Sequence, residues 1–167
     1  MRDKFDQIKV KENLVNKYLK YKNLEINRRF SSNKKKIKKL DHYLWWLKDQ
    51  KKRISTLIVK NGHNIFISTC DHYRFKNYQI IYSGLISCTQ NTNLFDLLKA
   101  IKLQNNYLDK NKGKYCFISI DKENKVLLHH WKYFGYKQLT KENKILNIIV
   151  DKFNFKQNFN VYYKYIL

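Results

Sequence analysis

The sequence predicts an α/β fold built on a mixed, mostly antiparallel sheet flanked by helices. Strand-like apolar runs alternate with helical segments through the middle of the 167-residue chain, the order typical of such a fold. Apolar residues make up 43% of the sequence and aromatic residues 16%, so the chain can bury a substantial core. The length fits one domain, with a basic helical lead-in over residues 1–40, a core over 41–140 and C-terminal strands over 141–167.

The first fifty residues predict two helices. Apolar residues near helical spacing predict a helix over 6–22, and the polar stretch 23–32 is expected to be a loop. Asp41 follows the lysine-rich run 34–39 and can cap a helix over 42–47, whose leucine and aromatic side chains give it a wide apolar face.

Three strands are expected next. Residues 54–59 are rich in β-branched side chains and end at an Asn-Gly turn signal, after which 64–69 returns, so the two runs predict a hairpin. The longest apolar run is 78–87. The glycine in its middle, Gly84, indicates a bulge or a close backbone approach.

Helix and strand alternate again in the following segment. Apolar residues at i, i+3, i+4 and i+7 from Leu94 predict a helix, and Asn93 and Asp96 have capping-box spacing at its start. A buried strand over 115–120 and an amphipathic helix over 124–134 come next.

The C-terminal part is less distinct. Gly135 ends the preceding helix, and a return strand is expected from Tyr136. Residues 145–150 and 159–167 predict further strands, or a strand and a helix.

The formal net charge of +22 has two interpretations. One is a polyanionic partner such as RNA, a membrane surface or a phosphorylated cofactor. The other is a compositional preference for lysine, because the lysines are spread along the whole chain and arginine is scarce.

The cysteines and histidines point to a reducing compartment and no metal site. The three cysteines lie far apart without CxxC spacing, so we expect a cytoplasmic or organelle-matrix protein with free, buried thiols. We expect no signal peptide and no membrane-spanning helix. His42, His63 and His72 lack metal-ligand spacing.

Residues that could perform chemistry occur at three places. The loop 88–93 precedes a helix and could cradle an anion at the helix N-terminus, or it could be an ordinary capped loop. The Asn124 amide could hold a peptide-like cofactor arm, or it could cap a helix. His130 and Tyr133 could transfer protons, or they could be core or surface residues.

Two segments carry recognisable patterns. Within residues 23–46, an asparagine is followed by an arginine, an isoleucine and the pattern His-x-x-Trp. Within 121–136, an asparagine is followed by aromatic residues and a Gly-aromatic pair. In these patterns the chain resembles the GNAT acyltransferase superfamily, and most closely the branch that acetylates amino groups on nucleotide-linked or surface-polysaccharide sugars. With the order of elements between them, the resemblance covers about residues 13–140.

The resemblance implies acetyl-CoA or another acyl-CoA as co-substrate, without a metal. It implies a sheet that opens between the run ending at Ser87 and the run ending at Ile120, so that pantetheine pairs with the exposed edge of 78–87. The implied cofactor-binding residues are Ile86, Ser87, Cys88, Thr89, Gln90, Asn91, Thr92, Asn93, Asn124 and Trp131. The implied residues on the acceptor side, for a small-molecule amine or a sugar nucleotide, are Arg28, His42, Trp45 and Trp46.

Two positions depart from the family's pattern. The phosphate loop lacks glycines and keeps only Gln90 of the usual residues, and Trp131 stands where many members have a tyrosine general acid. Proton transfer would therefore rely on Tyr133 or His130. These departures and the net charge also favour an alternative, in which a catalytically inactive GNAT-like protein binds RNA or a ribosomal or organellar ribonucleoprotein.

Overall fold

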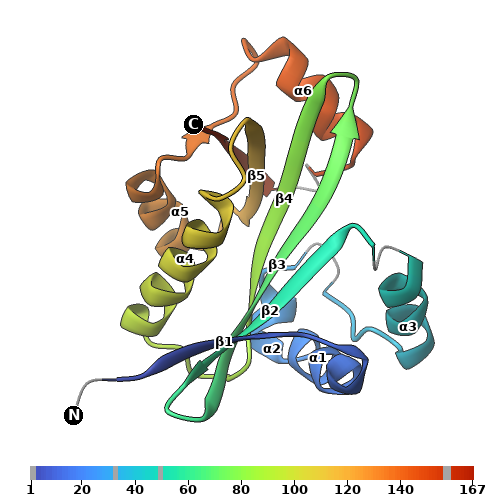
Figure 1. The fold of residues 1–167 in the computed structure, drawn as a ribbon, viewed down its shortest axis with the longest axis vertical. Helices are drawn as coiled ribbons and strands as arrows, with labels where there is room; N and C mark the ends of the chain where they lie inside the picture. Colours follow the sequence, from blue (N-terminus) through green and yellow to red (C-terminus); the bar gives the residue numbers. More distant parts are fainter. Residues whose placement is uncertain (1–2, 32–33, 49–50, 156–158) are drawn as a thin grey trace.

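The computed structural model describes residues 3–31, 34–48, 51–155 and 159–167, which form a mixed sheet flanked by helices (Figure 1). The sheet has the strand order β1-β2-β3-β4-β5-β7-β6. All neighbouring strands are antiparallel except β4 and β5, which are parallel, so the predicted fold class is confirmed. The strands are β1 Phe5–Lys9, β2 Arg53–Lys60, β3 His63–Phe75, β4 Tyr78–Ser87, β5 Lys114–Asp121, β6 Lys137–Gln138 and β7 Phe159–Ile166.

Helices cover both faces of the sheet. The α-helices are α1 Val15–Lys22, α2 Glu25–Arg29, α3 Lys39–Lys48, α4 Leu94–Leu108, α5 Lys125–His130 and α6 Lys144–Lys152, and the 3-10 helices are η1 Glu12–Leu14 and η2 Trp131–Phe134. Helices α4 and α5 lie over one face, and α1, α3 and α6 lie over the other (Figure 1). Adjacent side chains of β4 point to opposite faces of the sheet, since Ile81 packs with α4 and Ile80 packs with α6.

The N-terminal expectations are partly wrong. Residues 5–9 form an edge strand that pairs with β2, from Phe5 opposite Lys60 to Lys9 opposite Thr56, so tertiary pairing overrides the helical spacing there. The helical part begins only at Glu12. A short helix, α2, interrupts the predicted loop, and α3 begins at Lys39, so that Asp41 lies in its first turn.

Of the two alternatives for the C-terminal segment, the structure has the one with a helix and a strand, and not a pair of strands. Residues 144–152 form α6, whose buried side of Leu146, Ile149 and Val150 follows helical spacing. Strand β7 inserts between β5 and β6 and pairs with β5 at eight positions, so it belongs to the central sheet.

The middle of the chain follows the prediction closely. The β2–β3 hairpin turns at Asn61 and Gly62, which have φ of 48° and 83°, as a tight primed turn requires. Gly84 lies in regular register opposite Thr69, and a Cβ there would come within 3.3 Å of Thr69 Oγ1. Gly84 therefore marks a close approach and not a bulge.

Strands β4 and β5 separate soon after they meet. They pair only at Ile80–Tyr115, Ile81–Cys116 and Tyr82–Phe117. In the described residues, β4 has no β5 partner from Ser83 onward, while β5 from Ile118 pairs only with β7. The opening between these runs, expected from the sequence, is therefore confirmed.

Candidate active site at the opened sheet edge

The open edge of β4 presents backbone hydrogen-bonding groups. The Cys88 N–H donates to Ile65 O of β3 at 2.8 Å. Because successive residues of a strand alternate their backbone groups between the two sides, Leu85 and Ser87 direct theirs toward the opening. Such groups can bind a peptide-like ligand as an added strand would.

Asn27 of α2 already occupies one end of this edge. Its Nδ2 donates to Ser87 O at 2.7 Å, and its Oδ1 accepts from Ser87 N at 2.9 Å. Nδ2 also donates to Tyr21 O at 2.7 Å, which ties α1, α2 and β4 together. The edge open to a ligand is therefore shorter than the full strand expected to pair with pantetheine, and it centres on Leu85.

The predicted phosphate loop is held by a local contact and by a contact with α2. Ser87 Oγ donates to Thr89 O at 2.7 Å, and Gln90 Oε1 accepts from Ile26 N at 3.4 Å. Asn93 caps α4 by accepting from Asp96 N at 2.8 Å, as the capping-box spacing predicts. Phosphate binding by residues 88–93 stays a prediction.

A cavity of about 400 Å³ lies beside the open edge, on the sheet face covered by α1 and α3. Its floor includes Tyr82 and Ile86 of β4, and Gly84 between them has no side chain to fill it. Phe155 borders the cavity where the strands separate: its ring stacks on Tyr82 at 4.3 Å, and its carbonyl accepts from Ser119 of β5. The cavity thus shares a wall with the slot between the strands.

The far wall of this cavity holds two cations around one indole ring. Lys22 Nζ lies 3.6 Å and Arg53 Cζ lies 3.7 Å from the Trp45 ring centroid. Arg53 is also paired with Asp71, with Nε–Oδ1 at 2.6 Å and Nη2–Oδ2 at 3.1 Å. Both Asp71 oxygens are therefore held by the guanidinium.

Electrostatics lowers the proton affinity of Lys22. Burial and, secondly, the charge of Arg53 lower the pKa of Lys22 to about 8, although Asp71 acts in the opposite direction. A substantial fraction of this amine is then neutral just above physiological pH.

The four predicted acceptor-side residues take different positions. Trp45 lines the cavity. His42 is only 1% exposed, stacks on Trp45 at 5.2 Å and contacts Val15 O through Nε2, so it supports the indole from behind. Burial and then Lys22 lower the pKa of His42 to about 4, which keeps it neutral at physiological pH. Arg28 stabilises the backbone around α2 by donating hydrogen bonds to Asn23 O and Lys34 O.

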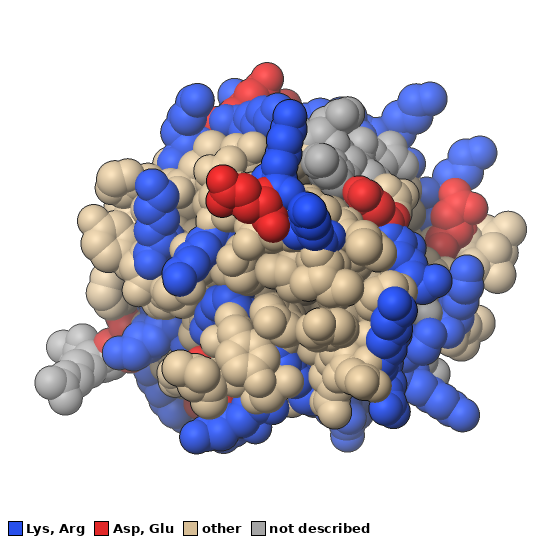
Figure 2. All heavy atoms as spheres, turned by 90° about the horizontal axis from the view of Figure 1, so that it is seen from above, with Lys and Arg blue, Asp and Glu red and all other residues tan. Residues whose placement is uncertain are grey.

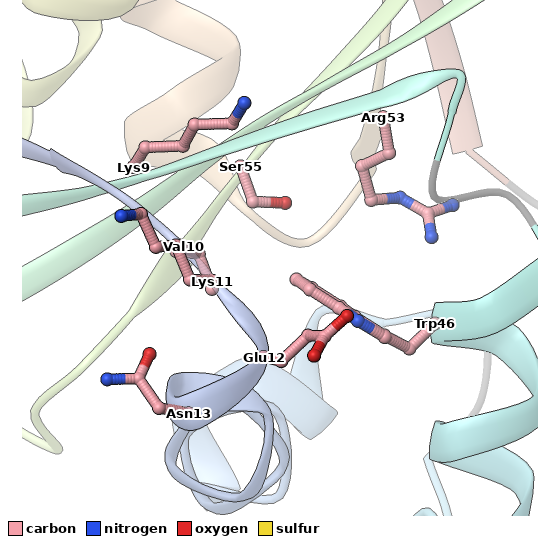
Figure 3. Close-up of a pocket in the computed structure, with 8 residues that line it drawn as sticks. All are labelled: Lys9, Val10, Lys11, Glu12, Asn13, Trp46, Arg53 and Ser55. Carbon is pink, nitrogen blue, oxygen red and sulfur yellow. The ribbon is translucent and has the colours of Figure 1, made fainter.

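Trp46 belongs to a second cavity, of about 540 Å³, near the end of β1. Figure 3 shows Ser55 from β2, Glu12 from η1 and Trp46 from α3 pointing toward the same space. Arg53 lines both cavities and separates them. Of the predicted acceptor residues, Trp45 and Trp46 therefore line two different cavities, and Arg28 and His42 line neither of them.

The residues predicted for proton transfer and for the pantetheine arm lie around α5. Tyr133 is 77% exposed and neither it nor His130 lines either cavity. Asn124 caps α5 by accepting from Leu127 N at 3.2 Å, and Trp131 is buried in the core against Tyr136. Their catalytic and cofactor contacts stay predictions.

The sequence analysis missed four residues of the site: Asn27, Lys22, Arg53 and Asp71. Each is polar or charged, as are many other residues of this chain, so residue type alone does not mark them as residues of the site. Arg53 and Asp71 come together because they are direct partners across β2 and β3. Their register depends on a one-residue shift between Ile58 and Val59, which the sequence does not reveal.

The analysis also missed a buried polar cluster where β4 and β5 separate. Cys116 Sγ lies 3.5 Å from Ser83 Oγ and 3.2 Å from Tyr136 OH. Burial and the Cys116 charge raise the pKa of Tyr136 well above its ordinary value, so its hydroxyl stays protonated.

This combination of a seven-stranded mixed sheet, separating parallel strands and an adjoining cavity is the fold of the GNAT acyl-CoA N-acyltransferases. The sequence matches no protein-family model and no curated protein, so the likeness is one of structure.

Three solved structures illustrate this likeness. Ribosomal-protein-alanine N-acetyltransferase from Brucella melitensis has a TM-score of 0.70 at 10% identity, covering 97% of this chain and 99% of that one. The yncA acetyltransferase from Salmonella typhimurium, solved with acetyl-CoA, has a TM-score of 0.64 at 10% identity and covers 81% of each chain. FdhC, a nucleotide-linked sugar GNAT, has a TM-score of 0.65 at 12% identity, covering 95% of this chain and 84% of that one.

The RNA-binding alternative predicts one continuous basic face. The face shown in Figure 2 is not of that kind, because uncharged and acidic side chains separate its lysines and arginines. Among the described residues, no helix has the length and apolar character needed to span a membrane.

Proposed function

We propose that the chain transfers an acyl group from acyl-CoA to a primary amine. The observation that carries this proposal is the three-residue pairing of β4 with β5, which leaves the backbone groups of Leu85 facing a slot next to a cavity. A pantetheine arm carries amide groups that can pair with such an edge, as an added strand does. The slot then delivers the thioester to the cavity.

The cavity suits direct attack by an amine. Backbone N–H groups at the edge can polarise the thioester carbonyl, since fixed donors stabilise the charge that develops on its oxygen. Trp45, supported by His42, forms a wall for the acceptor. Tyr133 or His130 supplies the proton for the leaving thiolate. A nucleotide-linked or polysaccharide amino sugar is the acceptor class that the sequence resemblance suggests.

Isothermal titration with acetyl-CoA tests the proposal directly. We expect binding to the wild-type chain and its loss in Leu85→Pro, because proline removes the N–H that faces the slot without removing a β3–β4 hydrogen bond. Leu85→Ala is the matched control, since it loses the same side chain but keeps the N–H. Absence of binding to the wild type at millimolar acetyl-CoA, or equal binding by both variants with thermal unfolding showing that both are folded, would contradict the proposal.

A further inference from the structure

We propose that Lys22 is itself an acyl acceptor, so that the chain acylates its own Lys22 Nζ when acyl-CoA is bound and no amine substrate is present. The inference rests on the proposed function and concerns a modification site inside the same cavity. Lys22 ends α1 and borders the cavity together with Tyr82 and Ile86, which flank the open stretch of β4. The amine and the proposed place of the thioester thus border the same cavity.

The contacts of Lys22 leave its nitrogen available for reaction. Nζ lies over the Trp45 ring, and within the described part of the chain no hydrogen bond or ion pair involves it. Arg53, the other cation of the cavity, is in contrast held by Asp71 and by Trp45 O. Attack by Nζ therefore breaks no hydrogen bond or ion pair of the described structure, and gives up only its cation–π contacts with Trp45 and Tyr18.

Burial and the Arg53 charge favour the neutral form of Lys22, and Asp71 opposes them. The lining groups are Tyr18 of α1, Arg53 of β2, Asp71 and Tyr73 of β3 and Tyr82 of β4, and His42 of α3 lies behind Trp45. Among them the Arg53 charge disfavours the ammonium ion, in the same direction as burial, and the resulting pKa of about 8 makes the free amine accessible near physiological pH.

The chemical step is the same as that proposed for an external amine. The Nζ lone pair attacks the thioester carbonyl carbon, a C–N bond forms and the C–S bond breaks. The proton lost from nitrogen ends on the CoA thiolate or on water, so the products are an Nζ-acyl lysine and free CoA. The modification removes one of the two positive charges beside Trp45, leaving that of Arg53, and fills part of the cavity.

Mass spectrometry of the full chain after incubation with acetyl-CoA at pH 8 tests the inference. We expect one acetyl group at Lys22, formed about tenfold faster than at Lys20, which lies on the exposed side of the same helix, because the bound thioester and Nζ share a cavity. Lys22→Arg should abolish the fast modification and Lys20→Arg should leave it intact. The rate at Lys22 should rise as the pH increases toward and past 8, as the ammonium ion loses its proton.

The outcomes separate this inference from the proposed function. Titration with acetyl-CoA is run on the same preparation. Binding without acetylation of Lys22, or equal rates at Lys22 and Lys20 and in the urea-unfolded chain, would overturn self-acylation and leave the proposed function standing. Failure to bind acetyl-CoA would overturn both.

Discussion

The side chain of Asn27 hydrogen-bonds both backbone polar groups of Ser87, with Nδ2–O at 2.7 Å and Oδ1–N at 2.9 Å. In this way α2 takes the place of a neighbouring strand at the end of β4. The contact fixes where the open edge stops, and it fixes the approach of α1, which carries Lys22 into the cavity.

Asn27→Ala should destabilise the fold and weaken acyl-CoA binding. Leaving partly buried backbone groups of Ser87 unpaired costs about 1–3 kcal/mol of unfolding free energy, which urea denaturation measures. Asn16→Ala is the control, because Asn16 contacts Tyr43 OH at the surface and its loss should cost less. Equal stability of both variants would show that the Asn27 contact contributes nothing specific.

The Arg53–Asp71 pair should be strongly coupled. The two side chains are 5% and 17% exposed, and Asp71→Asn leaves a largely buried guanidinium ion without its counter-charge, at a cost of about 3 kcal/mol. The double variant Arg53→Met/Asp71→Leu should regain part of that loss, because it removes both charges. A double-mutant cycle made of Arg53→Met, Asp71→Leu and the double variant, followed by thermal unfolding, measures the coupling. Additive losses would argue against it.

His42 should make the fold sensitive to acid. Its folded-state pKa of about 4 lies below the ordinary value of 6.5, so between these pH values the unfolded chain binds more protons than the folded one. Stability from this group is complete above about pH 6.5 and declines as the pH falls toward 4. The lowered pKa of His72 acts in the same direction.

Urea denaturation at a series of pH values tests this behaviour. His42→Phe should flatten the decline between pH 6.5 and 4 while keeping a ring against Trp45. His63→Phe, at an exposed position, should leave the decline as it is in the wild type. A slope unchanged by His42→Phe would contradict the assignment.

Tyr133→Phe tests the predicted proton donor. If the hydroxyl protonates the leaving thiolate, its removal should lower kcat by about 10²-fold or more and leave acetyl-CoA affinity unchanged. Steady-state kinetics and titration together separate these effects. Tyr165→Phe is a suitable control, because it removes an exposed hydroxyl from β7. A wild-type kcat in Tyr133→Phe would move the search for the donor to His130.

Local signals predicted the central fold well. The Asn-Gly turn, the long apolar run of β4 and the Asn93 cap act within a few residues, and the structure has all three. The conformations of residues 5–9 and 144–152 were harder to predict. The first segment is an edge strand without a buried face and the second is a short amphipathic helix, and the conformation of each depends on the elements that pack against it.

The site was less predictable than the fold. The open edge was predicted, and Trp45, a predicted acceptor-side residue, lines the cavity beside it. The cations beside Trp45 come from α1 and β2, which are distant in the chain. Their meeting depends on sheet register and on how α1 is anchored, and a single sequence shows neither directly. Aromatic and basic residues also occur throughout the chain, so these particular ones do not stand out in the sequence.

A recognition edge built from main-chain amides places few demands on the identity of side chains. Any residue other than proline supplies the same donor and acceptor, and this chain contains no proline. Such an edge can persist while almost every neighbouring side chain is exchanged. It offers a physical reason why the architecture matches structures that share only 10 to 15% of its residues.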